Sequence, residues 1–175
     1  MILNPEETIK QLLIRDDSRV ADFGAGSGVF ALAAMKYIHT GKIFVVDIQR
    51  GLLSRIMSNV PNEYQKNIEI IWGDIEEVCG SRIKSDSVDI VIFTNMLFQI
   101  VDKNSATTEI KRILKDKGQL LVVDWEGSFG NMGPKEEDIF SKEEAVFFFN
   151  KNGFVLSKEV PAGDFHYGLI FTLTK

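Results

Sequence analysis

Short apolar runs alternate along the chain with segments whose apolar residues recur at helical spacing. Each run is almost continuous in β-branched and aromatic residues, which is typical of strands buried on both faces of a parallel sheet. Five such runs lie at 19–23, 43–47, 68–72, 88–93 and 119–124, and two further strands are predicted at 155–160 and 167–173. The pattern therefore predicts a seven-stranded sheet.

The segments between the runs predict helices that start and stop at recognisable residues. Ser141 and Glu144 form a Ser-x-x-Glu capping box, and glycines follow the expected helix ends. Helices are expected at 5–14, 29–38, 52–60, 110–117 and 141–152, the last with Phe147, Phe148 and Phe149 on its core face. Strands that alternate with helices favour right-handed βαβ units. We expect an α/β fold: a doubly wound, mostly parallel sheet with helices on both faces and an antiparallel last strand.

Nothing in the pattern divides the chain, because no linker, repeat or low-complexity tract interrupts it. We expect one domain over 1–175, with an amino-terminal helix and cover at 1–18 and the core at 19–175. The start of the sequence lacks the features of a signal peptide, and no apolar run reaches the ~20 residues of a membrane span. The prediction is a cytoplasmic protein without a membrane span.

Composition and charge narrow the possible partners. The net charge of −5 weighs against a broad electrostatic grip on nucleic acid, which needs clustered Lys and Arg. Cys79 is the only cysteine, so the chain has no internal disulfide and no all-cysteine metal site. A nucleic-acid partner is therefore unlikely from sequence, no metal is expected, and a monomer and a homodimer both stay open.

The connection after the first strand carries the strongest chemical signal. It reads Asp22-Phe23-Gly24-Ala25-Gly26-Ser27-Gly28. Doubly wound sheets bind ligands beyond the carboxyl ends of their strands, and glycines let a ligand approach the backbone there. A dinucleotide fingerprint would require glycine at position 29, where this chain has Val29. The turn predicts a nucleotide-like ligand of another kind.

Acidic-x-Gly-x-Gly-x-Gly resembles the first motif of class I S-adenosylmethionine-dependent methyltransferases, which have a Rossmann-like fold. The resemblance continues at three later strand ends, at Val45-Val46-Asp47-Ile48, Trp72-Gly73-Asp74-Ile75 and Phe93-Thr94-Asn95-Met96. It implies that the last of these borders the methionine portion and the transferred methyl. It implies that Asp47 binds the ribose hydroxyls, that Ile48 packs on adenine and that Asp74 reads the adenine edge. The cofactor-binding residues it implies are Asp22, Phe23, Gly24, Ala25, Gly26, Gly28, Asp47, Ile48, Gly73, Asp74, Ile75, Thr94 and Asn95.

The resemblance implies methyl transfer from S-adenosylmethionine, and we expect a small-molecule acceptor. The segment Thr94–Phe98 lacks the Asn/Asp-Pro-Pro-Tyr motif of the family's amine-methylating enzymes, which disfavours adenine-N6 and glutamine as acceptors. Three alternatives stay open: a non-catalytic cofactor-binding subunit, a protein or RNA methyltransferase, and a nicotinamide-dependent oxidoreductase, against which Val29 argues.

Catalytic residues are harder to predict, because the sulfonium is already activated and a base is needed only when the nucleophile must lose a proton. The weak candidates are Asn95, Asp124 and His166. Asp124 is better interpreted as a strand-end cap, and His166 is better interpreted as a solvent-exposed hairpin residue. The glycine-rich segment 126–134 is a plausible mobile loop, for which we hypothesise a lid role.

Overall fold

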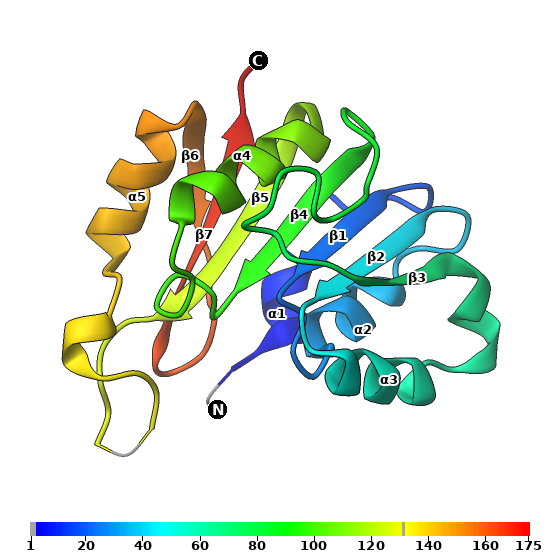
Figure 1. Ribbon diagram of the computed structural model, residues 1–175, viewed down its shortest axis with the longest axis horizontal. Coiled ribbons are helices and arrows are strands. Elements are labelled where there is room, and N and C mark those ends of the chain that lie inside the picture. Colours follow the sequence, from blue (N-terminus) through cyan, green and yellow to red (C-terminus); the bar gives the residue numbers. More distant parts are fainter. Residues whose placement is uncertain (1–2, 131) are drawn as a thin grey trace.

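A computed structural model describes residues 3–130 and 132–175 (Figure 1). Its strands are β1 Arg19–Phe23, β2 Lys42–Asp47, β3 Ile68–Trp72, β4 Val88–Thr94, β5 Leu114–Trp125, β6 Phe154–Glu159 and β7 His166–Leu173. Its α-helices are α1 Pro5–Ile9, α2 Val29–Met35, α3 Arg50–Asn59, α4 Lys103–Ile113 and α5 Lys142–Lys151. Two short 3₁₀ helices lie at Asn62–Asn67 and Glu136–Asp138.

The seven strands form one sheet in the order β3-β2-β1-β4-β5-β7-β6. Only β7 runs against its neighbours, pairing antiparallel with both β5 and β6. The chain moves outward from β1 to β3 and then returns to place β4 beside β1, so the strand order reverses between these two strands. Ligands of doubly wound sheets bind at that reversal. The predicted α/β class, strand count and antiparallel last strand are confirmed.

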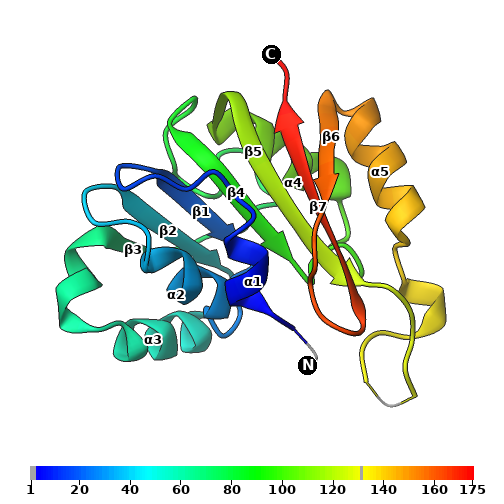
Figure 2. The same cartoon turned by 180° about the vertical axis from the view of Figure 1, so that it is seen from behind.

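Helices cover both faces of the sheet, and each face has its own apolar core. Figures 1 and 2 show α4 and α5 on one face and α1, α2 and α3 on the other. Strand residues alternate between the two cores, as the pleat requires: Phe23 and Phe93 pack toward α4 and α5, whereas Val20 and Ile92 pack toward α1 and α2. In the part of the chain that the structure describes, no helix has the length and apolarity to cross a bilayer.

Several helix boundaries differ from the sequence prediction: α2 ends at Met35 rather than Ile38, and α4 begins at Lys103 rather than Ile110. Two further differences have a clear structural cause. The amino-terminal helix stops at Ile9 rather than Ile14, because the Leu13 amide donates to the side-chain oxygen of Gln119 (2.9 Å) instead of continuing the helix. The helix after β4 ends at Ile113, since Leu114 already pairs with Val88 across the sheet. Both differences come from contacts between segments far apart in the sequence, which local periodicity does not contain.

The three consecutive phenylalanines of α5 do not share one environment. Phe149 is fully buried and packs edge-on against Phe148 and Phe154. Phe147 is 72% exposed, so the prediction that all three lie on the core face is wrong for this residue. Successive helical residues are about 100° apart, and a stripe that buries Phe149 turns Phe147 toward solvent.

Candidate functional site

The glycine-rich turn joins β1 to α2 and is tied to the end of β2. The Gly24 amide donates to the Val46 carbonyl (2.9 Å). Gly24 and Gly26 have φ of 66° and 55°, a left-handed conformation that favours glycine. A Cβ on Gly24 would collide with the sulfur of Met96, whereas one on Gly26 would meet nothing closer than 3.9 Å. The backbone at Gly26 is therefore open to a ligand, and at Gly24 it is covered by one side chain.

Gly28 has a packing role. It caps α2 with a φ of 79°, and a Cβ there would come within 2.9 Å of Ile56 on α3. The third glycine thus allows two helices to approach one another at the turn. It does not line the cavity described below.

Asp22 lies beneath the turn, on the α2 side of the sheet. Its side chain is buried, and Oδ2 accepts a hydrogen bond from the Ala31 amide (3.1 Å). Among the described residues, Oδ1 has no hydrogen-bond partner. Burial raises the pKa of Asp22 to about 7; the charge of Asp47 raises it further, and the Ala31 amide opposes the shift. Asp22 supports the turn from below and does not face the cavity.

A cavity of about 220 Å³ opens at the carboxyl ends of β1, β2, β3 and β4. It brings together seven of the residues predicted from the sequence: Gly24, Gly26, Asp47, Ile48, Gly73, Asp74 and Ile75. The other six do not line it: Asp22, Phe23, Ala25, Gly28, Thr94 and Asn95. The three strand-end motifs after β1, β2 and β3 therefore converge on one cavity.

Asp47 is the central acidic group of this cavity. Oδ2 accepts from the Gly26 amide (3.0 Å) and Oδ1 from the Gln49 amide (2.8 Å), and the side chain is buried. An ionised carboxylate has about four lone-pair sites. Two backbone donors thus orient Asp47 and leave acceptor capacity on both oxygens, which suits a ligand with two neighbouring hydroxyl groups.

Apolar and amide groups flank this carboxylate. Ile48 follows Asp47 and is 58% exposed, while its carbonyl accepts from the Trp72 indole nitrogen (2.9 Å). Arg50 stacks over the Trp72 ring, with its guanidinium carbon 3.9 Å from the centroid. Asp74 accepts from the Glu76 amide (2.9 Å), which fixes the loop after β3. A flat ring placed between the loop after β2 and the loop after β3 would meet the side chain of Ile48 on one face and the carboxylate of Asp74 at its edge.

Half of the lining lies outside the predicted cofactor-binding residues: Val46, Gln49, Leu52, Glu76, Met96, Gln99 and Ile100. Of these, only Met96 belongs to a motif that the resemblance places beside the methionine portion. Three of them come from the turn after β4. The available signal was Asn95, since asparagine is enriched among residues that adopt positive φ. Asn95 has a φ of 55°, and this turns the following residues back over the glycine turn.

The three candidate catalytic residues do not form one cluster. Asn95 lies outside the cavity lining, and Asp124 is buried with both oxygens bonded to backbone amides. The prediction that His166 is solvent-exposed is wrong: it is 4% exposed and its ring centroid lies 4.2 Å from that of Trp125. The antiparallel register places the two rings opposite one another on β7 and β5.

The segment 126–134 begins at the end of β5, and residue 131 lies outside the described residues. Around it, the Phe129 ring packs against Phe165 with centroids 4.5 Å apart, and the Glu126 amide donates to the Phe165 carbonyl (2.9 Å). The segment is thus attached to the connection between β6 and β7. Its role as a lid stays a prediction.

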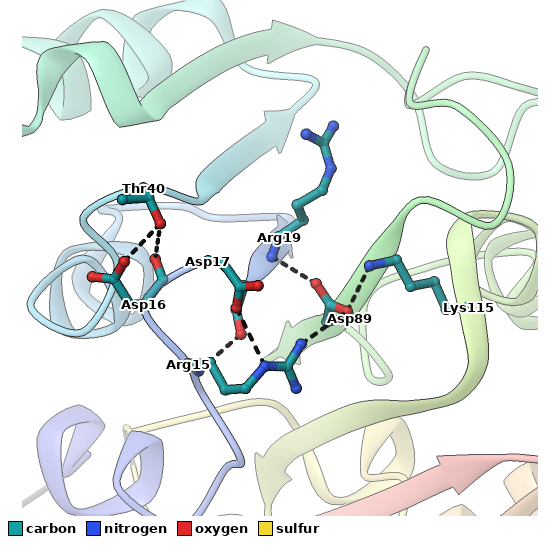
Figure 3. A network of polar contacts seen from close by, with 8 residues as sticks. Arg15, Asp16, Asp17, Arg19, Thr40, Asp89 and Lys115 are labelled. Carbon is teal, nitrogen blue, oxygen red and sulfur yellow. Dashed lines mark hydrogen bonds and ion pairs between the residues drawn. The ribbon is translucent and has the colours of Figure 1, made fainter.

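A separate polar network lies at the amino ends of the strands, opposite the cavity (Figure 3). Asp89 accepts from the Arg19 amide (2.8 Å) and the Lys115 ammonium (2.7 Å), and Arg15 approaches within 3.8 Å. Asp89 therefore fastens the amino ends of β1, β4 and β5 and is remote from Asp124 at the carboxyl end of β5. Over the described ranges, no group of three or more His, Cys, Asp or Glu side chains could hold a metal.

Comparison with known proteins decides the family. A family model described as a methyltransferase domain matches residues 14–159, which is most of the chain and contains all the cavity-lining residues. The chain belongs to the methyltransferase domain family. The resemblance predicted from the glycine turn is confirmed, and S-adenosylmethionine is the cofactor of class I members of this family.

Curated relatives match this methyltransferase domain over part of their length. The uncharacterized methyltransferase YcgJ of Bacillus subtilis is 29% identical over 116 residues, which are 66% of this chain and 44% of YcgJ. The ubiquinone/menaquinone biosynthesis C-methyltransferase UbiE of Hahella chejuensis is 25% identical over 136 residues, 77% of this chain and 53% of UbiE. The match spans about half the length of these two curated relatives.

Solved structures share the fold over nearly the whole chain. A SAM-dependent methyltransferase from Aquifex aeolicus superposes with a TM-score of 0.87 at 20% identity, covering 99% of this chain and 91% of that one. The YcgJ structure from Bacillus subtilis gives 0.72 at 18% identity, with 95% and 96% coverage. At these identities the likeness shows the fold, in agreement with the predicted sheet.

Proposed function

We propose that this methyltransferase domain binds S-adenosylmethionine in the cavity at the carboxyl ends of β1 to β4 and transfers its methyl group to a small-molecule acceptor. The observation that carries the proposal is the convergence of the glycine turn, Asp47 and Asp74 on one cavity. These groups match the chemical parts of the cofactor: a polar amino-acid end, a ribose and a purine.

The residues present fit the cofactor. The remaining lone pairs of Asp47 suit the two ribose hydroxyls, and Ile48 offers an apolar surface for adenine. Asp74 and Ile75 line the same cavity, where the Asp74 carboxylate and the following backbone would read the adenine edge. The open backbone at Gly26 leaves room for the methionyl part. When bound, S-adenosylmethionine supplies an activated methyl group, and the protein's task is to orient it.

The preference for a small acceptor rests on the net charge and on the turn after β4. A net charge of −5 weighs against a broad electrostatic grip on nucleic acid. The turn after β4 reads Thr94-Asn95-Met96-Leu97-Phe98 and has no Pro-Pro-Tyr element for an amino-group acceptor. These features support a small molecule over RNA, adenine-N6 or glutamine.

The cofactor site is tested by Asp47→Ala. This variant deletes charge-assisted acceptors and should weaken binding of S-adenosylhomocysteine by about 1.5–3 kcal/mol, measured by calorimetry. Asp17→Ala is the matched control, because Asp17 is exposed and lies at the opposite edge of the sheet (Figure 3). Equal affinity of a folded Asp47→Ala variant and the parent would place the ribose elsewhere.

The acceptor class is tested by labelled methyl transfer. The isolated chain is incubated with methyl-labelled S-adenosylmethionine and a cell extract that has been separated into metabolites, protein and RNA. We expect label in the metabolite fraction, and much less of it when Asp47→Ala replaces the parent. Label in protein or RNA would refute the small-molecule acceptor, and cofactor binding without any transfer would favour the non-catalytic subunit.

A further inference from the structure

Asp124 connects two loops at the carboxyl edge of the sheet. Oδ1 accepts from the amide of Trp125, its own neighbour on β5 (2.9 Å). Oδ2 accepts from the amide of Leu97, in the turn that follows β4 (2.8 Å). The side chain is 1% exposed. A strand-end cap of the kind expected from the sequence would bond only to its own following loop, whereas this carboxylate reaches across to a neighbouring one.

The turn that Asp124 holds forms one wall of the cavity. Met96 and Gln99 line the cavity on either side of Leu97, and the Met96 sulfur packs on Gly24. The Gln99 amide nitrogen donates to the Asn95 carbonyl (2.6 Å), and the Asn95 amide donates to Val123 (2.8 Å). Leu97 itself is buried and points away from the cavity lining. Its amide is therefore the anchor of the turn.

We infer that Asp124 is a positioning residue, whose carboxylate holds the turn 95–99 so that Met96 and Gln99 form the wall beside the methionyl part of the cofactor. The inference rests on the proposed function, since it assigns a role in that same cofactor site. It also removes Asp124 from the candidate bases. Its carboxylate is 1% exposed and does not line the cavity, so it is shielded from any acceptor bound there.

The surroundings of Asp124 make its hydrogen bonds sensitive to pH. Burial raises the pKa of Asp124 to about 6, against the opposing effect of the Trp125, Leu97 and Met96 amides. The charged and titratable groups that face it in the described structure are Lys103 on α4 and Tyr167 on β7. At pH 7 the carboxylate is ionised and its bond to Leu97 is charge-assisted. Below pH 6 protonation weakens that bond.

The first test is Asp124→Asn, with the affinity for S-adenosylhomocysteine measured by calorimetry between pH 5 and 8. The Asn side chain has one acceptor oxygen and turns an N–H toward the other backbone amide. At pH 7.5 we expect at least about tenfold weaker binding than in the parent. The parent should lose affinity as the pH falls below about 6, and the variant should lose less over the same range. Asp89→Asn is the control, since Asp89 also bonds backbone and side chains but at the opposite edge.

A double-mutant cycle shows whether Asp124 acts through the turn. Met96→Ala removes the side chain that the turn presents to Gly24. If Asp124 works by placing Met96, Asp124→Asn should weaken binding much less in the Met96→Ala background than in the parent. Additive effects would overturn the inference. Should Asp124→Asn fail to fold, the Leu97 amide proton of the parent serves instead: its chemical shift should titrate with a midpoint near pH 6, and a shift that is constant from pH 5 to 8 would overturn the inference.

The outcomes separate the inference from the proposed function. If the parent binds S-adenosylhomocysteine and Asp124→Asn binds it equally well at every pH, the positioning role fails while the cofactor site stands. If the parent itself does not bind, the proposed function fails.

Discussion

The raised pKa of the buried Asp22 leads to a quantitative prediction of how the stability of this methyltransferase domain depends on pH. It is an aspartate with 1% exposure, one hydrogen bond and a pKa raised to about 7, mainly by burial. In the unfolded chain the pKa of an aspartate is about 3.9. Between these two values the folded protein holds a proton that the unfolded chain has lost. Stability therefore falls as the pH rises from about 4 to about 7, and then levels off.

The loss of stability can be calculated from the difference between the pKa values of Asp22 in the unfolded and folded states. Each pKa unit corresponds to about 1.36 kcal/mol, so the contribution of Asp22 falls by roughly 2–3 kcal/mol between pH 5 and pH 8. Asp22→Asn keeps an acceptor for the Ala31 amide and cannot ionise. At pH 5 the variant resembles the protonated parent. At pH 8 it should be more stable than the parent by about 2–3 kcal/mol beyond any difference seen at pH 5.

The assay is urea unfolding without cofactor at pH 5, 6, 7 and 8, with the free energy of unfolding taken from the midpoint and slope. Asp124 titrates in an overlapping range, but it is present in both proteins and cancels in the difference. Asp17→Asn is the control, because its side chain is 71% exposed. A difference between Asp22→Asn and the parent that stays constant from pH 5 to 8 would refute the assignment of a raised pKa to Asp22.

Two further predictions concern packing, and both are measured by urea unfolding at pH 7. Gly28→Ala should lower the free energy of unfolding by about 2–4 kcal/mol, since it combines a positive φ with a clash against Ile56; a loss below about 0.5 kcal/mol would mean that the turn relaxes freely. Phe149→Ala should cost about 3–5 kcal/mol by leaving a cavity. Its matched control Phe147→Ala, at an exposed position on the same helix, should cost less than about 0.5 kcal/mol. Similar losses for the two phenylalanines would contradict the burial pattern of α5.

The parts of the site predicted from the sequence are those fixed by strand ends. Asp47 ends β2, Gly26 and Asp74 lie shortly after β1 and β3, and the carboxyl ends of parallel strands meet on one side of the sheet. Their convergence needs only the strand assignment and the strand order. The strand ends therefore predicted where the cavity lies, whereas its ligand class was implied by the resemblance to class I methyltransferases.

The parts that the sequence did not reveal depend on how loops fold back. Gln99 and Ile100 reach the cavity from a turn in which Asn95 takes a left-handed conformation and the Leu97 amide bonds to Asp124. The burial of His166 depends on the antiparallel register that sets it opposite Trp125. None of these features has a local hydrophobic period, so periodicity could not predict them.

Asp22 and Asp124 are both buried carboxylates that accept backbone amides, and they lie on opposite faces of the sheet. Strand alternation turns Asp22 toward α2 and Asp124 toward the side of α4 and α5. Each is buried at a strand end, and each accepts a backbone amide from a segment beside the cavity: Ala31 in the helix that follows the glycine turn, and Leu97 in the turn that carries Met96.

Burial raises the pKa of both carboxyls, to about 7 and about 6, so both contribute most to stability when they are protonated. Their hydrogen bonds to the segments beside the cavity are strongest when they are ionised. Acidification from pH 8 to pH 5 should therefore favour the fold through both groups and, through Asp124, loosen the turn that carries Met96. We expect stability and cofactor affinity to respond to pH in opposite directions, because the buried carboxylate of Asp124 affects both.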